Sequence, residues 1–235
     1  MKKLKSDLHL HTKEDIKSRG HSVDLTAKEL IDIAADENYE VLAIANHKTV
    51  TYNQELVDYA LKRNILLIPA QEIEIKKRHI LLINFKEPTK IKSYRDIMEQ
   101  KCENNLVIAP HPFFPRMYSL RNKVKQHLKL FDAIEFSGFY SNIVNFNKPA
   151  LKFAQKYNIP IIGNSDTHYR FQFGTTYSLI ESKKDIISII KAIKSGKIEI
   201  ISRPFTTVEL SLFVLEVLFN KYKYLIKYLI NISKK

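Results

Sequence analysis

The hydrophobic positions of this chain form short runs that alternate with stretches of helical spacing. The runs predict seven strands, at residues 4–9, 41–45, 66–69, 79–85, 106–109, 133–136 and 159–163. The helical spacing predicts five helices, at residues 26–37, 54–63, 94–103, 150–157 and 185–194. Thr26 and Glu29 match a capping box at the start of the first helix. This alternation is typical of repeated strand–helix units on a parallel sheet, closed as a barrel or left open.

The residues after 204 follow a different pattern. Between Val208 and Ile230, apolar residues trace one helical stripe, interrupted by charged residues that come too often for a membrane span of roughly twenty apolar residues. We therefore expect a domain over residues 1–204 and an amphipathic helical extension over 205–235. We favour packing of this extension on the barrel or on a partner subunit over contact with a membrane surface.

The composition predicts a single domain and a cytoplasmic location. Of 235 residues, 45% are apolar, which suffices for one core, and no Pro-, Gly- or Ser-rich linker divides the chain. Charged residues occur throughout the first fifteen positions, where a secretory leader would be apolar. The single cysteine, Cys102, excludes an intrachain disulfide and a cysteine-based zinc module.

Basic residues outnumber acidic ones by 38 to 25, giving a formal net charge of +13 that attracts phosphate-bearing partners. The surplus is scattered rather than clustered, so we attribute most of it to a lysine-rich composition, with nucleic acid or anionic lipid as the alternatives.

Two motifs place histidines and carboxylates on extended segments. In DLHLH at residues 7–11, His9 and His11 are separated by one residue, so both imidazoles point the same way and can bind one metal ion. In NSDTH at residues 164–168, Asp166 and His168 share one face directly after an apolar strand.

Further candidates end or open strands. His47, Glu72 and His111 each follow an apolar run, and His79 opens the run after Glu72. The carboxyl ends of parallel strands gather at one edge, where imidazole and carboxylate together suit a metal site. Of the eight histidines, only His127 lies elsewhere. The other seven lie at such positions, namely 9, 11, 21, 47, 79, 111 and 168.

These motifs resemble the polymerase and histidinol phosphatase (PHP) superfamily, whose hallmarks are DLHxHT, a strand ending in TDH, a Glu-containing segment, an AHP turn and SDxH. Here they read DLHLHT, ANH, PAQEIEI, APHP and NSDTH, in the same order across residues 7–168. The resemblance implies an α/β fold, a distorted (β/α)7 TIM-like barrel with the helical extension at its C-terminus. It also implies three divalent metal ions, which would be Zn, Mn or Fe.

The resemblance also assigns the ligands. His9, His11, Glu72 and Asp166 would hold the first ion, and Glu72 would bridge to a second ion. The second ion would be completed by His79 and His111, and the third would be held by His47, His168 and one residue of the loop after the first strand. We choose His21 for this loop ligand, with Asp15 as the alternative. Asn46 stands where the family usually has Asp, and its loss of charge is expected to tune metal affinity.

Clustered divalent ions favour phosphoester hydrolysis, because they activate water and stabilise a phosphoryl group in transfer. Glu72 and Asp166 are the candidate catalytic residues, and Asp166 or a water is the candidate general acid. Arg116 and Arg170 lie in strand-end loops that suit phosphate binding. The predicted activity is that of a phosphatase on a small phosphorylated metabolite or nucleotide. The alternatives are an exonuclease-like phosphodiesterase on nucleic acid ends and a non-catalytic metal-binding scaffold.

Truncation after Pro204 tests the packing of the extension. Loss of the helix is expected to lower soluble expression or to change the oligomeric state, because it would uncover apolar surface. Size-exclusion chromatography of the truncated and full-length chains measures both. If neither changes, the extension does not pack on the domain or on a partner subunit.

Overall fold

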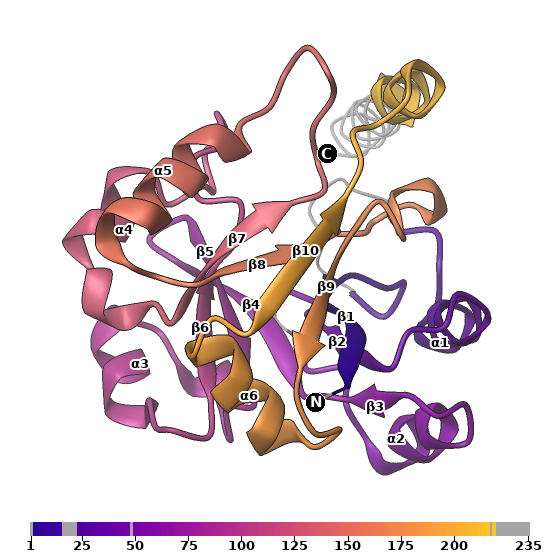
Figure 1. The fold of residues 1–235 in the computed structure, drawn as a ribbon, viewed down its shortest axis with the longest axis horizontal. Coiled ribbons are helices and arrows are strands. Elements are labelled where there is room, and N and C mark those ends of the chain that lie inside the picture. Colours follow the sequence, from indigo (N-terminus) through magenta and orange to yellow (C-terminus); the bar gives the residue numbers. More distant parts are fainter. Residues whose placement is uncertain (1, 16–22, 48, 217, 220–235) are drawn as a thin grey trace, which may run out of the picture.

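Two five-stranded sheets form the centre of the protein (Figure 1). The structure, a computed structural model, describes residues 2–15, 23–47, 49–216 and 218–219. The first sheet has the order β10-β9-β1-β2-β3, with bounds Ile198–Ser202, Thr176–Glu181, Lys3–Leu10, Val41–Ile44 and Leu66–Leu67. The second has the order β4-β5-β6-β7-β8, with bounds Ala70–Ile75, Arg78–Ile83, Leu106–Ala109, Ala133–Ser137 and Ile161–Asn164.

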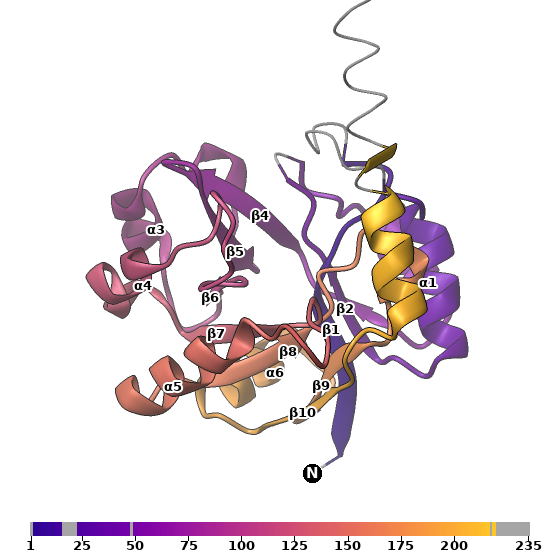
Figure 2. The same cartoon turned by 90° about the horizontal axis from the view of Figure 1, so that it is seen from above.

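Helices cover the outer faces of both sheets, as Figure 2 shows from above. The α-helices are α1 (Ala27–Asp36), α2 (Gln54–Leu61), α3 (Tyr94–Gln100), α4 (Asn122–Gln126), α5 (Asn147–Tyr157) and α6 (Ile186–Lys194). Short 3-10 helices lie at Pro88–Lys90, Leu128–Leu130 and Arg170–Gln172, and residues 207–216 begin a further helix. The capping box of Thr26 and Glu29 forms at the start of α1 as predicted.

The predicted (β/α)7 barrel is wrong, because the described strands form two mixed sheets and no closed barrel. Strands β1, β2 and β3 are parallel, as are β6, β7 and β8, but β9, β10 and the β4–β5–β6 unit pair antiparallel. Between the segments of the two sheets, isolated bridges join Leu10 to Thr167, His47 to Glu72 and Ser141 to Phe205 in the described residues.

Local features that apolar runs do not reveal explain this difference. Lys76 and Lys77 both have positive φ, 49° and 59°, which is the geometry of a two-residue turn that folds β4 back on β5. In β9, buried and partly exposed residues alternate, and the inward Ser178 is polar. Such a strand carries no apolar run, so neither its presence nor its direction was predicted.

The core between the sheets keeps one end of the molecule closed. Buried apolar residues from both sheets pack together, and α6 adds Ile189, Ile190 and Ile193 to this cluster. In Figure 1, α6 lies near the N-terminal end of β1. The opposite ends of the parallel strands are therefore left for the polar residues that follow them.

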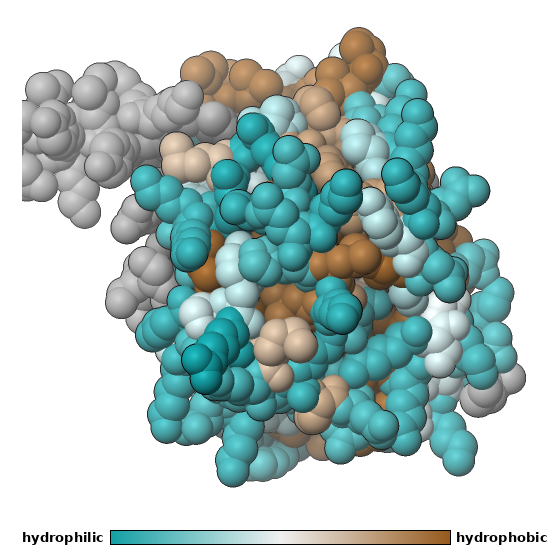
Figure 3. All heavy atoms as spheres, turned by 90° about the vertical axis from the view of Figure 1, so that its left-hand side faces the viewer, coloured by the Kyte–Doolittle hydropathy of each residue, from teal (hydrophilic) through white to brown (hydrophobic). Residues whose placement is uncertain are grey.

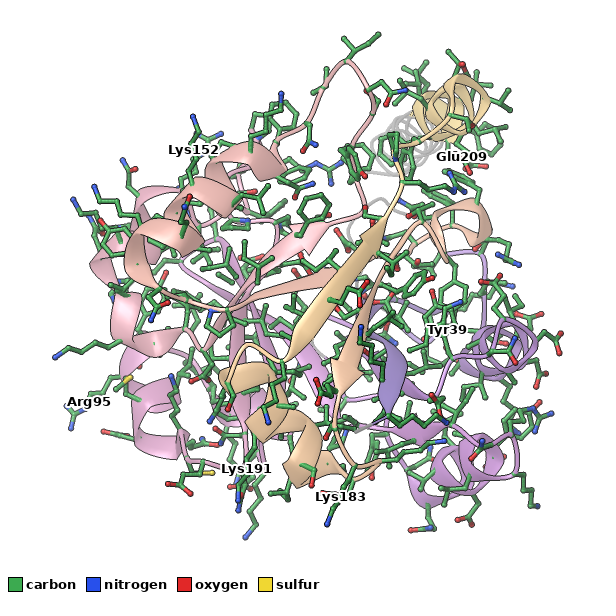
Figure 4. The ribbon with its side chains drawn as sticks, viewed as in Figure 1. Tyr39, Arg95, Lys152, Lys183, Lys191 and Glu209 are labelled. Atoms are coloured by element: carbon green, nitrogen blue, oxygen red, sulfur yellow. The ribbon has the colours of Figure 1, made fainter. Side chains whose placement is uncertain are left out.

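The surface is largely hydrophilic on the side that carries α3, α4 and α5 (Figure 3). In Figure 4, Arg95, Lys152 and Lys191 project outward from three separate helices, in line with a scattered basic surplus. None of the described helices is long and apolar enough to cross a membrane.

The described start of the extension contacts the domain through aromatic rings. The Phe213 ring centroid lies 4.5 Å from that of Phe139, while Val208 and Leu215 are 69% and 61% exposed. That the extension packs on the domain or on a partner subunit stays a prediction, as does the domain boundary at residue 204.

Gly163 in β8 lies against β10 of the other sheet, and its replacement tests that contact. A Cβ at this position would lie 2.6 Å from Cγ2 of Ile200 in β10. We expect Gly163→Ala to lower the free energy of unfolding by about 1–3 kcal/mol, the usual cost of overpacking. Chemical denaturation measures this change.

The matched control removes Cγ2 of Ile200, the atom that the new Cβ would clash with. In an Ile200→Ala background, the further change Gly163→Ala should cost less than it does in the wild type, because the clash with Cγ2 is absent. Equal costs in both backgrounds would show that the contact with Ile200 is not the cause.

Candidate metal centre

The polar residues at the strand ends converge on one buried cluster. His9 lies in β1 and His11 directly after it, while Glu72 and His79 face each other across the β4–β5 hairpin. The remaining members follow the ends of β2, β6 and β8: His47, His111, Asp166 and His168. Eight of the nine predicted ligands therefore come together, and the ninth, His21, lies outside the described residues.

The Glu72 carboxylate is the centre of this cluster. Five imidazoles have a ring nitrogen within 3.6 Å of its oxygens: His9, His11, His47, His79 and His111. The shortest distances are 2.8 Å, from Oε2 to Nε2 of His47 and from Oε1 to Nδ1 of His79. The two oxygens thus face different histidines, as a carboxylate that bridges two cations would.

Three groups of side chains have ligand atoms within 4.8 Å of one another and could each hold an ion. They are His9–His11–Asp166, His11–His47–Glu72 and Glu72–His79–His111. The groups overlap at His11 and Glu72. The first and last groups are subsets of the ligand sets expected for the first and second ions, and the middle group places His47 against Glu72.

His168 lies beside the first group. Its ring centroid is 4.3 Å from that of His11, and its Nδ1 is 3.6 Å from Oδ1 of Asp166. It is therefore close enough to join an ion on this side of the cluster.

Opposite charges in a buried site shift the titration of the acids. Burial alone would raise the pKa of Glu72, but the charges of His79, His47 and His9 hold it well below its usual range. Burial alone would likewise raise the pKa of Asp166, but the neighbouring histidines keep it far below its usual range. Both carboxylates are therefore anionic at neutral pH, as ligands of a cation must be.

The donor set and its unpaired atoms fit divalent ions. Buried atoms without a hydrogen-bond partner in the described structure include Nδ1 of His11, Nδ1 of His111 and Oδ1 of Asp15. Such atoms are uncommon in folded proteins unless water or an ion satisfies them. Imidazole and carboxylate together suit Zn, Mn or Fe.

Two of the candidate ligands have strained backbones. The φ angles of His111 and Asp166 are 30° and 55°, in the left-handed region that non-glycine residues rarely adopt. Strain of this kind collects at functional sites, where the surrounding contacts hold it.

Asp15, the alternative loop ligand, lies in the cluster. The residue is buried, and its Oδ2 accepts from the backbone N–H of His47 at 3.1 Å and lies 2.8 Å from His47 Nδ1. Burial alone would raise the pKa of Asp15, but the neighbouring His11 and His47 lower it. His21 lies outside the described residues, so the choice between His21 and Asp15 as the loop ligand stays a prediction.

Three buried residues that the sequence reasoning missed support the ligands. Glu135 accepts hydrogen bonds from His9 and His111, Asn164 accepts from the backbone of β1, and Asp7 accepts from Ser165 N–H. Burial raises the pKa of Asp7 to about 7, more than its hydrogen bonds lower it. Glu135 could have been found as a lone carboxylate in the apolar strand AIEFS.

The predicted arginines and Asn46 contact other groups. Arg170 pairs with Glu37 at 3.0 Å, and the Arg116 guanidinium lies 4.8 Å over the Phe139 ring. Asn46 accepts from Thr12 N–H at 2.9 Å and donates to the Thr12 hydroxyl, so it holds the segment after His11 in place. None of these contacts tests the substrate-binding roles.

Comparisons with known proteins show what this chain is similar to. A family model described as PHP-associated matches residues 144–198. Protein MJ1587 of Methanocaldococcus jannaschii is 24% identical over 65% of this chain and 95% of its own length.

Two solved structures share the fold. A two-domain protein from Bacteroides vulgatus, which contains a predicted PHP-like metal-dependent phosphoesterase, is 18% identical with a TM-score of 0.64. That match covers 86% of this chain, which spans 65% of the Bacteroides protein. PsfC from Pseudomonas syringae is 17% identical over 94% of this chain and 99% of its own, with a TM-score of 0.63.

The fold and the cluster define an α/β protein with a histidine- and carboxylate-rich site at its strand ends. In its motif order over residues 7–168 and in the PHP-associated match over residues 144–198, the chain is similar to the PHP superfamily.

The metal-free protein is expected to lose stability as pH rises above neutral. Burial alone would lower the pKa of His47, but Glu72 and Asp15 raise it from its ordinary 6.5 to about 10. Because the pKa is higher in the folded state, this contribution is fully present below about pH 6.5 and is lost as pH rises through about 10. Urea denaturation in chelator across this range measures the decline.

Glu72→Gln provides the comparison. Without the Glu72 charge, the pKa of His47 is raised less. Stability should therefore fall less steeply between pH 6.5 and 10 than in the wild type. Parallel stability curves for the two proteins would contradict the electrostatic account of the cluster.

Proposed function

We propose that this chain is a metal-dependent phosphoester hydrolase that uses three divalent ions. The observation that carries the proposal is the buried Glu72 carboxylate, whose two oxygens face separate sets of imidazoles. A protein gains little stability from such a cluster alone, since desolvation of so many charged or titratable groups is costly. Binding of cations would offset this desolvation cost.

The proposed ligands follow the three groups and the resemblance. His9, His11 and Asp166 would hold the first ion with Glu72, and Glu72 would bridge to a second ion on His79 and His111. The third ion would be held by His47 and His168 with either Asp15 or His21. Zn, Mn and Fe all suit these donors.

The remaining chemistry falls to the chain's own groups. When bound, the ions supply Lewis acidity that lowers the pKa of water and neutralises charge on phosphoryl oxygens. The lowered pKa of Asp166 suits an anionic ligand better than the general acid for the leaving group. A water molecule then becomes the better candidate for that acid.

Substrate phosphate would be bound beside the cluster by arginine. Arg116 is exposed and its loop follows His111, so its guanidinium is available to a phosphate oxygen. Arg170 would first have to leave Glu37. We therefore give Arg116 the larger share of substrate binding.

We propose a small phosphorylated metabolite or nucleotide as the substrate. Supporting this choice, the phosphoesterase-containing Bacteroides protein shares the fold. The net charge of +13 favours the second candidate, exonuclease-like cleavage of nucleic acid ends. Retention of the predicted ligands in the described cluster argues against a non-catalytic scaffold.

A phosphatase panel tests the activity. Wild-type protein loaded with Mn²⁺ should release phosphate from at least one phosphorylated metabolite or nucleotide, and chelator should abolish the release. The His9→Ala, Asp166→Ala double variant should lose at least about 100-fold in rate. Loss of two ligands should cost more than loss of a residue that only hydrogen-bonds to a ligand. Full metal occupancy without turnover of any phosphoester would falsify the proposal.

The nucleic acid alternative has a separate test. Binding to a single-stranded oligonucleotide should weaken only slightly with salt if the substrate is a small molecule, because few phosphates are contacted. A steep linear fall of log affinity with log salt, as several phosphate contacts produce, would favour the exonuclease-like activity.

A further inference from the structure

Glu135 lies behind the candidate ligands and touches two of the three groups at once. It is fully buried in the middle of β7, between ligand-bearing strand ends. Its Oε1 lies 2.8 Å from Nδ1 of His9 and accepts from Asn164 Nδ2 at 2.9 Å, while Oε2 accepts from the backbone N–H of His111 at 2.7 Å.

We propose that Glu135 is a positioning residue that couples two ion sites, the one formed by His9 with His11 and Asp166 and the one formed by Glu72 with His79 and His111. The proposal rests on the proposed metal centre. Glu135 does not belong to any of the three ligand groups, and its effect is transmitted through His9 and His111.

The contact with His9 fixes which ring nitrogen faces the ion. An ionised carboxylate only accepts hydrogen bonds, so the proton of the neutral imidazole must sit on Nδ1. This leaves the Nε2 lone pair directed at the cluster, where it lies 3.6 Å from both Asp166 Oδ1 and Glu72 Oε2. A carboxylate behind a histidine ligand orients the ring and raises its basicity in the same way in many metal sites.

The contact with His111 holds a strained turn. His111 has a φ of 30° and precedes Pro112, and residues before proline are further restricted in their backbone conformation. The hydrogen bond from its N–H to Oε2 is charge-assisted, which makes it stronger than one to a neutral acceptor. Glu135 therefore stabilises the conformation that directs the His111 ring to Glu72.

Replacement by glutamine breaks this arrangement whichever way the amide turns. With its oxygen toward His9 and Asn164, the amide NH₂ group meets the His111 N–H, and two donors then oppose each other. With its oxygen toward His111, the NH₂ group meets His9 and Asn164. His9 must then accept at Nδ1 and carry its proton on Nε2, where it cannot bind an ion.

Calorimetric titration with Zn²⁺ tests the coupling. Glu135→Gln should weaken at least one binding event by about 10–100-fold and change the affinity in both groups, as loss of an outer carboxylate does. Glu74→Gln, the same change at an exposed position of β4, serves as the matched control and should bind as the wild type does. Unchanged affinities in Glu135→Gln would overturn the proposal.

Histidine NMR of the Zn²⁺-loaded wild type supplies a readout that does not depend on the variant folding. His9 should carry its proton on Nδ1, and a proton on Nε2 would overturn the proposal. Should the wild type bind no ion, the metal centre itself fails.

Glu135 can still be tested in metal-free protein, through hydrogen exchange of the His111 amide. Glu135→Gln should speed this exchange at least about tenfold, because a hydrogen bond to a charged group is lost. Equal exchange rates in the two proteins would overturn the positioning role, independently of the metal.

Discussion

The buried Glu72 carboxylate, with five imidazoles around it, is the interaction on which the rest of the site depends. An isolated carboxylate at this depth would be neutral, because desolvation disfavours its charge. The surrounding histidines reverse that preference and keep Glu72 anionic. Several positive groups must then lie within a few ångströms, so the ends of β1, β2, β5 and β6 all have to meet the strand that carries Glu72.

The fold meets this demand without closing a barrel. Parallel strands in each sheet bring His9, His47 and Asp166 to the same side of the molecule, and the β4–β5 hairpin sets His79 beside Glu72. The apolar core and α6 occupy the other end, so packing and chemistry are separated along the strands. Strained backbones at His111 and Asp166 show that the packed scaffold, more than local preference, fixes the ligands.

The sequence predicted the site better than the architecture. The histidines and acids were expected at one edge of the sheet because they recur together at strand ends, and the strands at residues 4–9 and 106–109 were located closely. Strand direction was not predictable from apolar runs, and β9 carries polar residues inward. Glu135 was missed because it is no ligand in the motif pattern; its importance lies in contacts between distant segments, which only the folded chain reveals.

Anomalous diffraction from crystals grown with Mn²⁺ tests the central claim most directly. The account predicts anomalous difference peaks on both sides of the Glu72 carboxylate, one against His9 and His11 and another against His79 and His111. Ordered side chains in the positions described, with no anomalous peak near Glu72 at saturating Mn²⁺, would contradict it.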